Sequence, residues 1–310
     1  MTFDEALLAF LRSRESKNNS PKTVAWYWDQ INRFHDWLTE QGTNGSSWLK
    51  PEVVETFLAG ERARGLRPGT VNARYRALRA FFNWLKGRGY LGDQANPMNE
   101  VDAPRVPEPD RDHVTVEELH ALYASIPAEG WTAQRDRAIL LVLFWSGLRV
   151  GELVNLTIHD VDTRTQLITV RQGKGGKSRV VPCTPKLPEV LLAYLYQRPA
   201  WPGAGLWLSA DGGGGVRGQL TTEGVRQMLL RRCRAGGVRY LHPHAWRHGF
   251  AMTLLNAGAE MSSISTMMGH SSTKLTEDVY AKWLTDGLSS EYNRVLERIE
   301  KRGSKKTLNG

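Results

Sequence analysis

The sequence predicts a mainly α-helical protein with a small β-sheet, divided into two domains. Apolar residues recur at spacings of three and four along most of the chain, which is typical of helices that bury one face. Two short β-type runs flank a glycine-rich turn and indicate a hairpin. A proline-rich stretch without periodicity, from Asn96 to Asp112, separates the halves, and 310 residues fit two domains of about 100–200 residues each.

Residues 1–100 are expected to form a domain of four or five helices. Ser20 followed by Pro21 is a typical helix start, with serine as the cap and proline in the first turn. Arg74, Arg76 and Arg79 lie between the apolar positions of the fourth helix, so they are expected to face solvent or a partner. The predicted helices cover residues 3–15, a segment from Pro21, residues 51–64 and a segment from Pro68.

Residues 101–112 are expected to be an extended linker, and residues 113–310 a second domain. Thr115 and Glu118 are placed as in a capping box and open that domain. The strongly apolar run 135–145 predicts a buried helix. After it we expect β-type runs at 167–170 and 179–181 around the turn 173–177, a helix at 187–198, a loop at 203–218, helices at 221–235, 243–257 and 262–268, and a last amphipathic helix at 288–299.

Composition argues against membrane and secreted proteins. The longest apolar run, Ala138 to Trp145, is far shorter than the roughly 20 residues of a membrane span. Asp4 and Glu5 precede any apolar stretch, unlike a signal peptide. Cys183 and Cys233 are the only cysteines, and their spacing fits neither a disulfide framework nor a zinc site. The expected location is cytoplasmic, and no membrane partner is expected.

Positive charge is concentrated in stretches without acids. The formal net charge is +9, and residues 62–88, 164–186 and 226–239 hold basic residues but no Asp or Glu. Any one stretch is explained as the solvated face of a helix, but three together favour a surface that meets phosphates. Nucleic acid is therefore the leading partner, and we expect the protein to be associated with the nucleoid.

No cofactor and no metal ion is expected. The glycines at 173–177 and 213–218 lack the strand–loop–helix context of a phosphate-binding loop. His244 and His248 are spaced like metal ligands on a helix, but no acidic residue lies nearby until Glu260.

Several residues that indicate no function one by one have, as a set, the chemistry that one reaction needs. Arg149 alone suggests an ion pair with Glu152, His244 a core histidine, and Lys174 a solvated hairpin residue. With Arg247, His270 and Tyr280 they suit displacement at a phosphodiester. Arginines bind the phosphate oxygens, a lysine protonates a leaving alkoxide, and a tyrosine attacks and holds the phosphoryl group.

The chain resembles the tyrosine recombinase (phage integrase) family. Four segments follow the family's sequence boxes in the family's order: Gly147–Leu153, Gly173–Pro182, Pro243–Ala251 and Met268–Tyr280. A helical N-terminal domain precedes them, as in the family. Because a helix begins at Phe3, the sequence favours the simple two-domain type of Xer-like or Cre-like size, without an additional arm-binding domain.

The resemblance implies a role for each matching residue. Arg149 and Arg247 resemble the two phosphate-clamping arginines, and Lys174 resembles the general acid for the 5′-oxygen. His244 matches a position that assists proton transfer, and His270 one that supports the phosphate and nucleophile. Tyr280 matches the nucleophile, and Glu152 an acid of more structural role.

The resemblance also implies a mechanism and an assembly. A core-binding (SAM-like) domain and a catalytic domain would form a C-shaped clamp on duplex DNA. Tyr280 would form a 3′-phosphotyrosine, and four protomers would exchange strands through a Holliday junction. An accessory DNA-bending or directionality protein fits this scheme, and the helix at 288–299 would dock on a neighbouring protomer or pack in cis.

Residues that contact DNA outside the site are harder to choose, because phosphate and base contacts use the same side chains. Our candidates are Arg74, Arg76, Arg79, Lys177 and Arg179. Two other functions stay open: DNA relaxation like that of type IB topoisomerases, and DNA binding without catalysis by the same fold.

Overall fold

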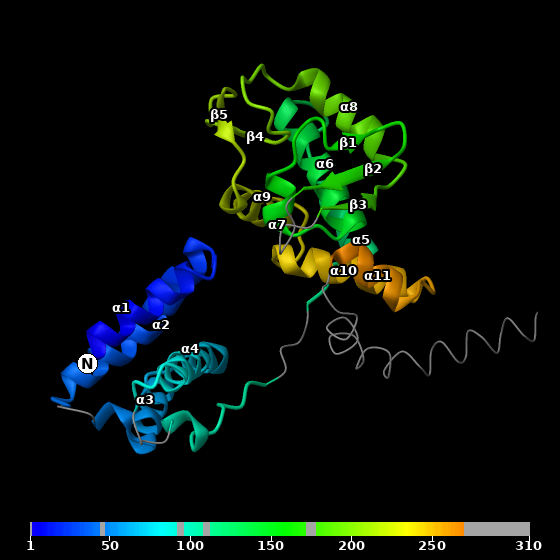
Figure 1. The fold of residues 1–310 in the computed structure, drawn as a ribbon. Helices are drawn as coiled ribbons and strands as arrows, with labels where there is room; N and C mark the ends of the chain where they lie inside the picture. The colour runs from blue at the N-terminus through cyan, green and yellow to red at the C-terminus, as the bar shows by residue number, and fades with distance from the viewer. Residues whose placement is uncertain (1, 44–46, 92–95, 108–111, 172–177, 270–310) are drawn as a thin grey trace, which may run out of the picture. The chain divides into compact units, whose positions relative to one another are not determined.

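The computed structural model describes residues 2–43, 47–91, 96–107, 112–171 and 178–269. The chain folds into two compact units, Met1–Pro109 and Asp110–Gly310. Each unit has its own hydrophobic core, and the labelled strands all belong to the second unit (Figure 1). Within the described ranges, no helix combines the length and the apolarity needed to cross a bilayer.

The first unit is helical, and its four main helices start as the sequence predicts. Ser20 Oγ accepts a hydrogen bond from the Thr23 backbone N–H at 3.2 Å, which caps the second helix. The buried faces meet in an aromatic core that includes Phe10, Phe34, Phe57 and Phe81. The elements are α1 (Phe3–Glu15), α2 (Pro21–Glu40), the 3₁₀ turn η1 (Ser47–Leu49), α3 (Pro51–Ala63), α4 (Pro68–Gly87) and the 3₁₀ turn η2 (Pro97–Asn99).

The structure corrects one expectation for α4. Arg76 and Arg79 are exposed, but the side chain of Arg74 is only 15% exposed and contacts the carboxylate of Glu61 on α3. Glu61 is 1% exposed. A carboxylate buried in a helix interface needs a cation beside it, and Arg74 is the α4 residue that supplies one. The prediction was wrong because the partner of Arg74, Glu61, lies on another helix and outside the acid-free stretch.

The second unit contains the other helices and both sheets. Its first helix begins at the predicted capping box of Thr115 and Glu118. The elements are α5 (Val116–Ala124), α6 (Trp131–Ser146), α7 (Val150–Val154), β1 (Val161–Asp162), β2 (Leu167–Val170), β3 (Arg179–Pro182), α8 (Leu187–Gln197), β4 (Leu208–Ala210), β5 (Val216–Gln219), α9 (Thr222–Ala235), α10 (Pro243–Asn256) and α11 (Met261–Met268).

Helix α6 is the central element of this unit. Most of its side chains are buried, as its apolar sequence predicts, and it packs against α8 and α10 (Figure 1). The strands β1, β2 and β3 form an antiparallel sheet in that order, with Val170 opposite Arg179. The predicted hairpin is therefore confirmed, although its turn, with Lys174 and Lys177, lies outside the described residues.

The segment 203–218 is not a plain loop, contrary to the prediction. β4 and β5 form an antiparallel hairpin within it. Its turn is a run of glycines in which Gly212 and Gly214 have φ of 96° and 92°, which side chains larger than hydrogen disfavour. Asp211 Oδ1 accepts the N–H groups of Gly213 and Gly215 at 2.9 and 3.0 Å. The glycine density concealed two strands that are only three and four residues long.

Candidate functional site

The first arginine of the site stands where two helices meet. α6 ends at Ser146 and is capped by Gly147, whose φ of 61° turns the chain sharply. Arg149 is the residue that precedes α7. The backbone N–H of Arg149 donates to Glu152 Oε2 at 2.8 Å, and its Nη1 donates to Oε1 at 3.0 Å. The expected Arg149–Glu152 ion pair is therefore confirmed.

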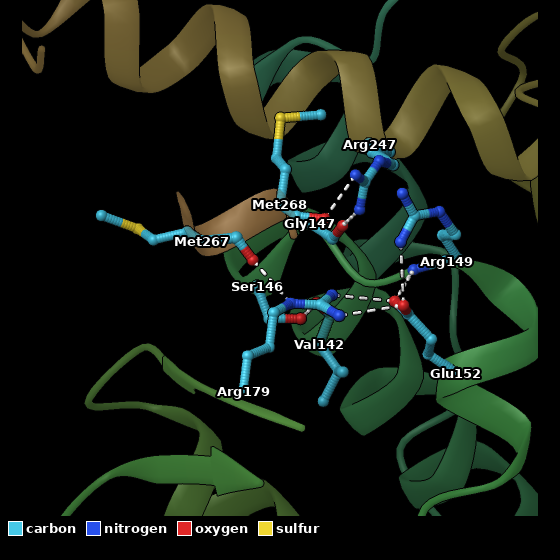
Figure 2. A network of polar contacts seen from close by, with 9 residues as sticks. All are labelled: Val142, Ser146, Gly147, Arg149, Glu152, Arg179, Arg247, Met267 and Met268. Carbon is cyan, nitrogen blue, oxygen red and sulfur yellow. Dashed lines mark hydrogen bonds and ion pairs between the residues drawn. The ribbon is translucent and has the colours of Figure 1, made fainter. Parts of the chain in front are cut away.

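The second arginine, Arg247, is fixed by the ends of two other helices. It lies on α10, is 6% exposed, and donates from Nη1 to the Gly147 carbonyl. Its Nη2 donates to the Met268 carbonyl, at the end of α11, at 2.6 Å. Figure 2 shows these bonds beside the Arg149–Glu152 pair. The segment before Arg149 thus carries the carbonyl that orients Arg247.

Arg179, a candidate DNA contact, makes its described contacts within the protein. It makes a two-point contact with Glu152, with Nη1 to Oε1 and Nη2 to Oε2, both at 2.9 Å (Figure 2). Its Nε donates to the Met267 carbonyl at 2.9 Å. With its side chain 13% exposed, Arg179 connects β3 to α7 and α11.

Glu152 stays ionised because of these partners. Its burial opposes ionisation, but hydrogen bonds from Arg179 and from the Arg149 backbone, with the charges of both arginines, outweigh burial and lower the pKa of Glu152 to about 2. At neutral pH the carboxylate therefore carries a full charge between the two guanidinium groups.

His244 is positioned by the first turn of α10. The residue before the helix, His242, caps it by accepting the Ala245 N–H on Nδ1 at 3.2 Å. The imidazole of His244 is exposed, yet partial desolvation by the surrounding protein, followed by the charges of neighbouring residues including His242 and Arg247, lowers its pKa. The ring is therefore mainly neutral at pH 7.

Arg149, His244 and Arg247 line one cavity of about 670 Å³. These three residues were predicted to act together, and the structure places them on one cavity. Asp160 and Arg171, which were not predicted as site residues, line the same cavity. Arg171 directly follows β2 and Asp160 directly precedes β1, and their pairing is visible only in the folded chain. The predicted residues Lys174, His270 and Tyr280 lie outside the described residues.

Family models match both units. The model described as "Phage integrase family" matches residues 113–285, and "Phage integrase, N-terminal SAM-like domain" matches residues 6–89. Curated relatives match nearly the whole chain. Tyrosine recombinase XerA of Thermococcus kodakarensis is 33% identical, over 96% of this chain and 98% of the relative. Tyrosine recombinase XerC of Oceanobacillus iheyensis is 31% identical, over 91% and 92%.

Solved structures share the fold. The Tn1549 transposon integrase in complex with a circular intermediate DNA aligns with a TM-score of 0.70 and 19% identity, over 94% of this chain and 99% of that one. The XerH recombinase bound to its palindromic difH substrate aligns with a TM-score of 0.71 and 18% identity, over 90% and 81%. The chain therefore belongs to the phage integrase family and is a tyrosine recombinase, an enzyme of site-specific DNA recombination.

Proposed function

We propose that this recombinase cuts and rejoins DNA with Tyr280 as nucleophile and Arg149 and Arg247 as the clamp on the scissile phosphate. The observation that carries the proposal is the cavity in which these two arginines and His244 meet. A guanidinium group binds the non-bridging oxygens of a phosphate and neutralises the charge that grows in the transition state. Two such groups supply the positive charge that metal ions supply in other phosphoryl-transfer enzymes.

The reaction balances in two steps. The Tyr280 hydroxyl oxygen attacks phosphorus and loses its proton with the help of neutral His244, and the bond to the 5′-oxygen breaks. Lys174 gives the 5′-oxygen a proton. A 5′-hydroxyl of the partner strand then attacks the phosphotyrosine phosphorus and gives its proton to Lys174, while the bond to Tyr280 breaks and its oxygen takes back the proton from His244. His270 supports the phosphate and the nucleophile. The phosphodiester energy is kept in the intermediate, so the scheme has no step that uses ATP.

We infer that the partner is a duplex recombination site held by four copies of the chain, with strands exchanged through a Holliday junction. The family membership and the acid-free basic stretches support duplex DNA as the substrate. Domains at about 1–100 and 113–310, joined by a linker, both contact the DNA. An accessory bending or directionality protein fits the same scheme, as does a cytoplasmic, nucleoid-associated location.

Covalent trapping tests the proposal. A binding sequence is selected from a random duplex pool with the wild-type protein, then prepared as a series of duplexes nicked at successive positions. Incubation in EDTA and a denaturing gel should show a protein–DNA adduct for wild type and none for Tyr280→Phe. Tyr196→Phe is the matched control, because Tyr196 is 92% exposed and outside the cavity.

The other outcomes are equally informative. Salt-sensitive binding with no adduct on any nicked duplex would contradict the cleavage chemistry and favour a DNA-binding protein of the same fold. Relaxation of supercoiled plasmids without dependence on the selected sequence would favour a topoisomerase. An adduct that persists in Tyr280→Phe would move the nucleophile to another residue.

A further inference from the structure

Arg171 brings a third guanidinium group to the candidate site. It follows the last residue of β2, its side chain is 64% exposed, and it lines the same cavity as Arg149, His244 and Arg247. The Nε–H of Arg171 donates to Asp160 Oδ1. An arginine has five N–H donors, so four, on the two Nη atoms, remain. Within the described ranges no protein group accepts a hydrogen bond from these four.

Hydrogen bonds fix Asp160, so that its carboxylate holds Arg171 in one orientation. It is 3% exposed, and its Oδ2 accepts the backbone N–H and the hydroxyl of Thr157 at 2.8 and 2.7 Å. Its backbone carbonyl accepts the Thr169 N–H of β2 at 2.8 Å. Burial opposes ionisation of Asp160, but the hydrogen bonds from Arg171 and Thr157 outweigh it and lower the pKa. Asp160 is thus a fixed anion whose other oxygen is free to anchor the Nε of Arg171.

The lining of the cavity is positively charged, and its volume has room for more than one phosphate. Three arginines and two carboxylates, Glu152 and Asp160, line it, so it favours an anion. Its volume of about 670 Å³ lies in the range of pockets that hold drug-sized ligands, which a single phosphate group does not fill. Arg149 and Arg247 account for one phosphate in the proposed function, and Arg171 reaches the cavity from the sheet rather than from α7 or α10.

We propose that Arg171, anchored by Asp160, forms a second phosphate-binding position in this cavity. It binds a backbone phosphate of the same DNA strand next to the scissile one, by a two-point contact from its Nη atoms. This proposal rests on the proposed function, because it takes DNA as the ligand. Its effect is to fix the strand at two points, so that the scissile phosphate is held in register for attack.

The test measures binding without cleavage. Full-length protein carrying Tyr280→Phe is titrated with the selected duplex over a series of KCl concentrations. Arg171→Ala should bind about tenfold more weakly and reduce the slope of log Kd against log salt by about one, as expected for one lost phosphate contact. Arg171→Lys keeps the charge but not the fork, so it should retain most of the slope. Arg164→Ala is the matched control, because Arg164 is exposed in the turn between β1 and β2 and lies outside the cavity.

Neutral phosphates locate the contact. The same duplex is made with a single methylphosphonate at each position around the scissile phosphate. A methylphosphonate at one position next to the scissile phosphate should weaken binding by the parent protein. The same methylphosphonate should not weaken binding by Arg171→Ala any further. An unchanged salt slope, an equal loss at every position, or a match at the scissile phosphate itself would overturn the proposal. Arg171→Ala also leaves the buried Asp160 carboxylate without its ion-pair partner, so its melting temperature should fall, and binding is compared at a temperature where both proteins are folded.

The assay also separates this proposal from the proposed chemistry. Failure of wild type to form an adduct would refute the role of Tyr280 while the methylphosphonate result stands. A normal adduct with no effect of Arg171→Ala on binding would refute the second phosphate position alone.

Discussion

Arg179 and Glu152 form a two-point ion pair in which each Nη of the arginine donates to a different carboxylate oxygen, both at 2.9 Å. Glu152 also accepts the backbone N–H and Nη1 of Arg149. Since Arg179 belongs to β3 and Arg149 precedes α7, one carboxylate connects the sheet to the residue proposed to clamp the phosphate. We therefore expect Glu152 to act as a positioning residue.

Glu152→Gln is expected to slow formation of the covalent adduct by about 10- to 100-fold, because a small displacement of a clamping group has an effect of that size. DNA binding should weaken much less, since the arginine charges remain. Single-turnover adduct formation and equilibrium binding on the selected duplex measure the two effects. Glu129→Gln is the control, because Glu129 is exposed and outside the cavity. Equal losses in both assays would argue against a positioning role.

The same carboxylate makes stability depend on pH. Its pKa is lowered from 4.5 to about 2, so its ionised form stabilises the folded state above about pH 4.5, and that contribution is lost as the pH falls towards 2. The shift corresponds to at most about 3 kcal/mol. The difference in unfolding free energy between wild type and Glu152→Gln should therefore shrink over this interval. A difference that is constant with pH would show that the ionised form carries no stability.

Arg179 and Arg76 should behave oppositely when each is replaced by alanine. Arg179→Ala removes one partner of a buried carboxylate, which costs about 3–5 kcal/mol, so its melting temperature should fall while the salt slope of DNA binding stays unchanged. Arg76 is exposed on α4, and Arg76→Ala should keep the melting temperature and lower the slope by about one if it meets a phosphate. Calorimetry measures the melting temperature of both variants, and salt titration of DNA binding measures the slope. A lowered slope for Arg179→Ala would restore it as a DNA contact.

Helices and their starts could be predicted because their signals are local. Ser20 with Pro21, and Thr115 with Glu118, carry the capping chemistry within a few residues. The pairing of Arg74 with Glu61 could not be predicted, since it depends on how α3 packs against α4. The β4–β5 hairpin was missed because short strands around four glycines give little periodicity.

In the candidate site, too, the residues with local sequence signals could be predicted and the residues that depend on packing could not. Arg149, His244 and Arg247 could be chosen from motifs, and the structure places them on one cavity. Arg171 and Asp160 could not, because their pairing depends on the register of β1, β2 and the turn before them. A sequence motif identifies residues that take part in one reaction. A residue that orients one of them, such as Asp160, can be recognised only in the folded chain.

His244 should titrate below its ordinary pKa of 6.5, because partial desolvation and nearby positive charges disfavour the imidazolium. The rate of adduct formation should therefore fall as the pH drops through a midpoint below 6.5, where the ring gains its proton and cannot accept another. NMR titration of the imidazole gives the midpoint independently. His244→Gln should lack this limb of the profile. A pKa of His244 at or above 6.5 would contradict a proton-accepting role for the neutral ring.

Gly147 should tolerate no side chain, because it has both a left-handed backbone and a close neighbour. Its φ is 61°, and a Cβ there would overlap the ring of Phe250. Its carbonyl also accepts from Arg247, so a shift of the backbone would move the proposed phosphate clamp. We expect Gly147→Ala to lose about 2–4 kcal/mol of stability, from strain at positive φ and from overpacking, and to lose most adduct formation.

Gly65 is the matched control for that variant. It follows α3 with a φ of 81°, but no described atom lies within 4 Å of the position of its Cβ. Gly65→Ala should therefore cost only the backbone term, about 1 kcal/mol, and leave adduct formation unchanged. Calorimetric unfolding and the trapping gel compare the two variants. Equal destabilisation would assign the whole effect to φ, and normal cleavage by Gly147→Ala would show that the Gly147 carbonyl does not orient Arg247.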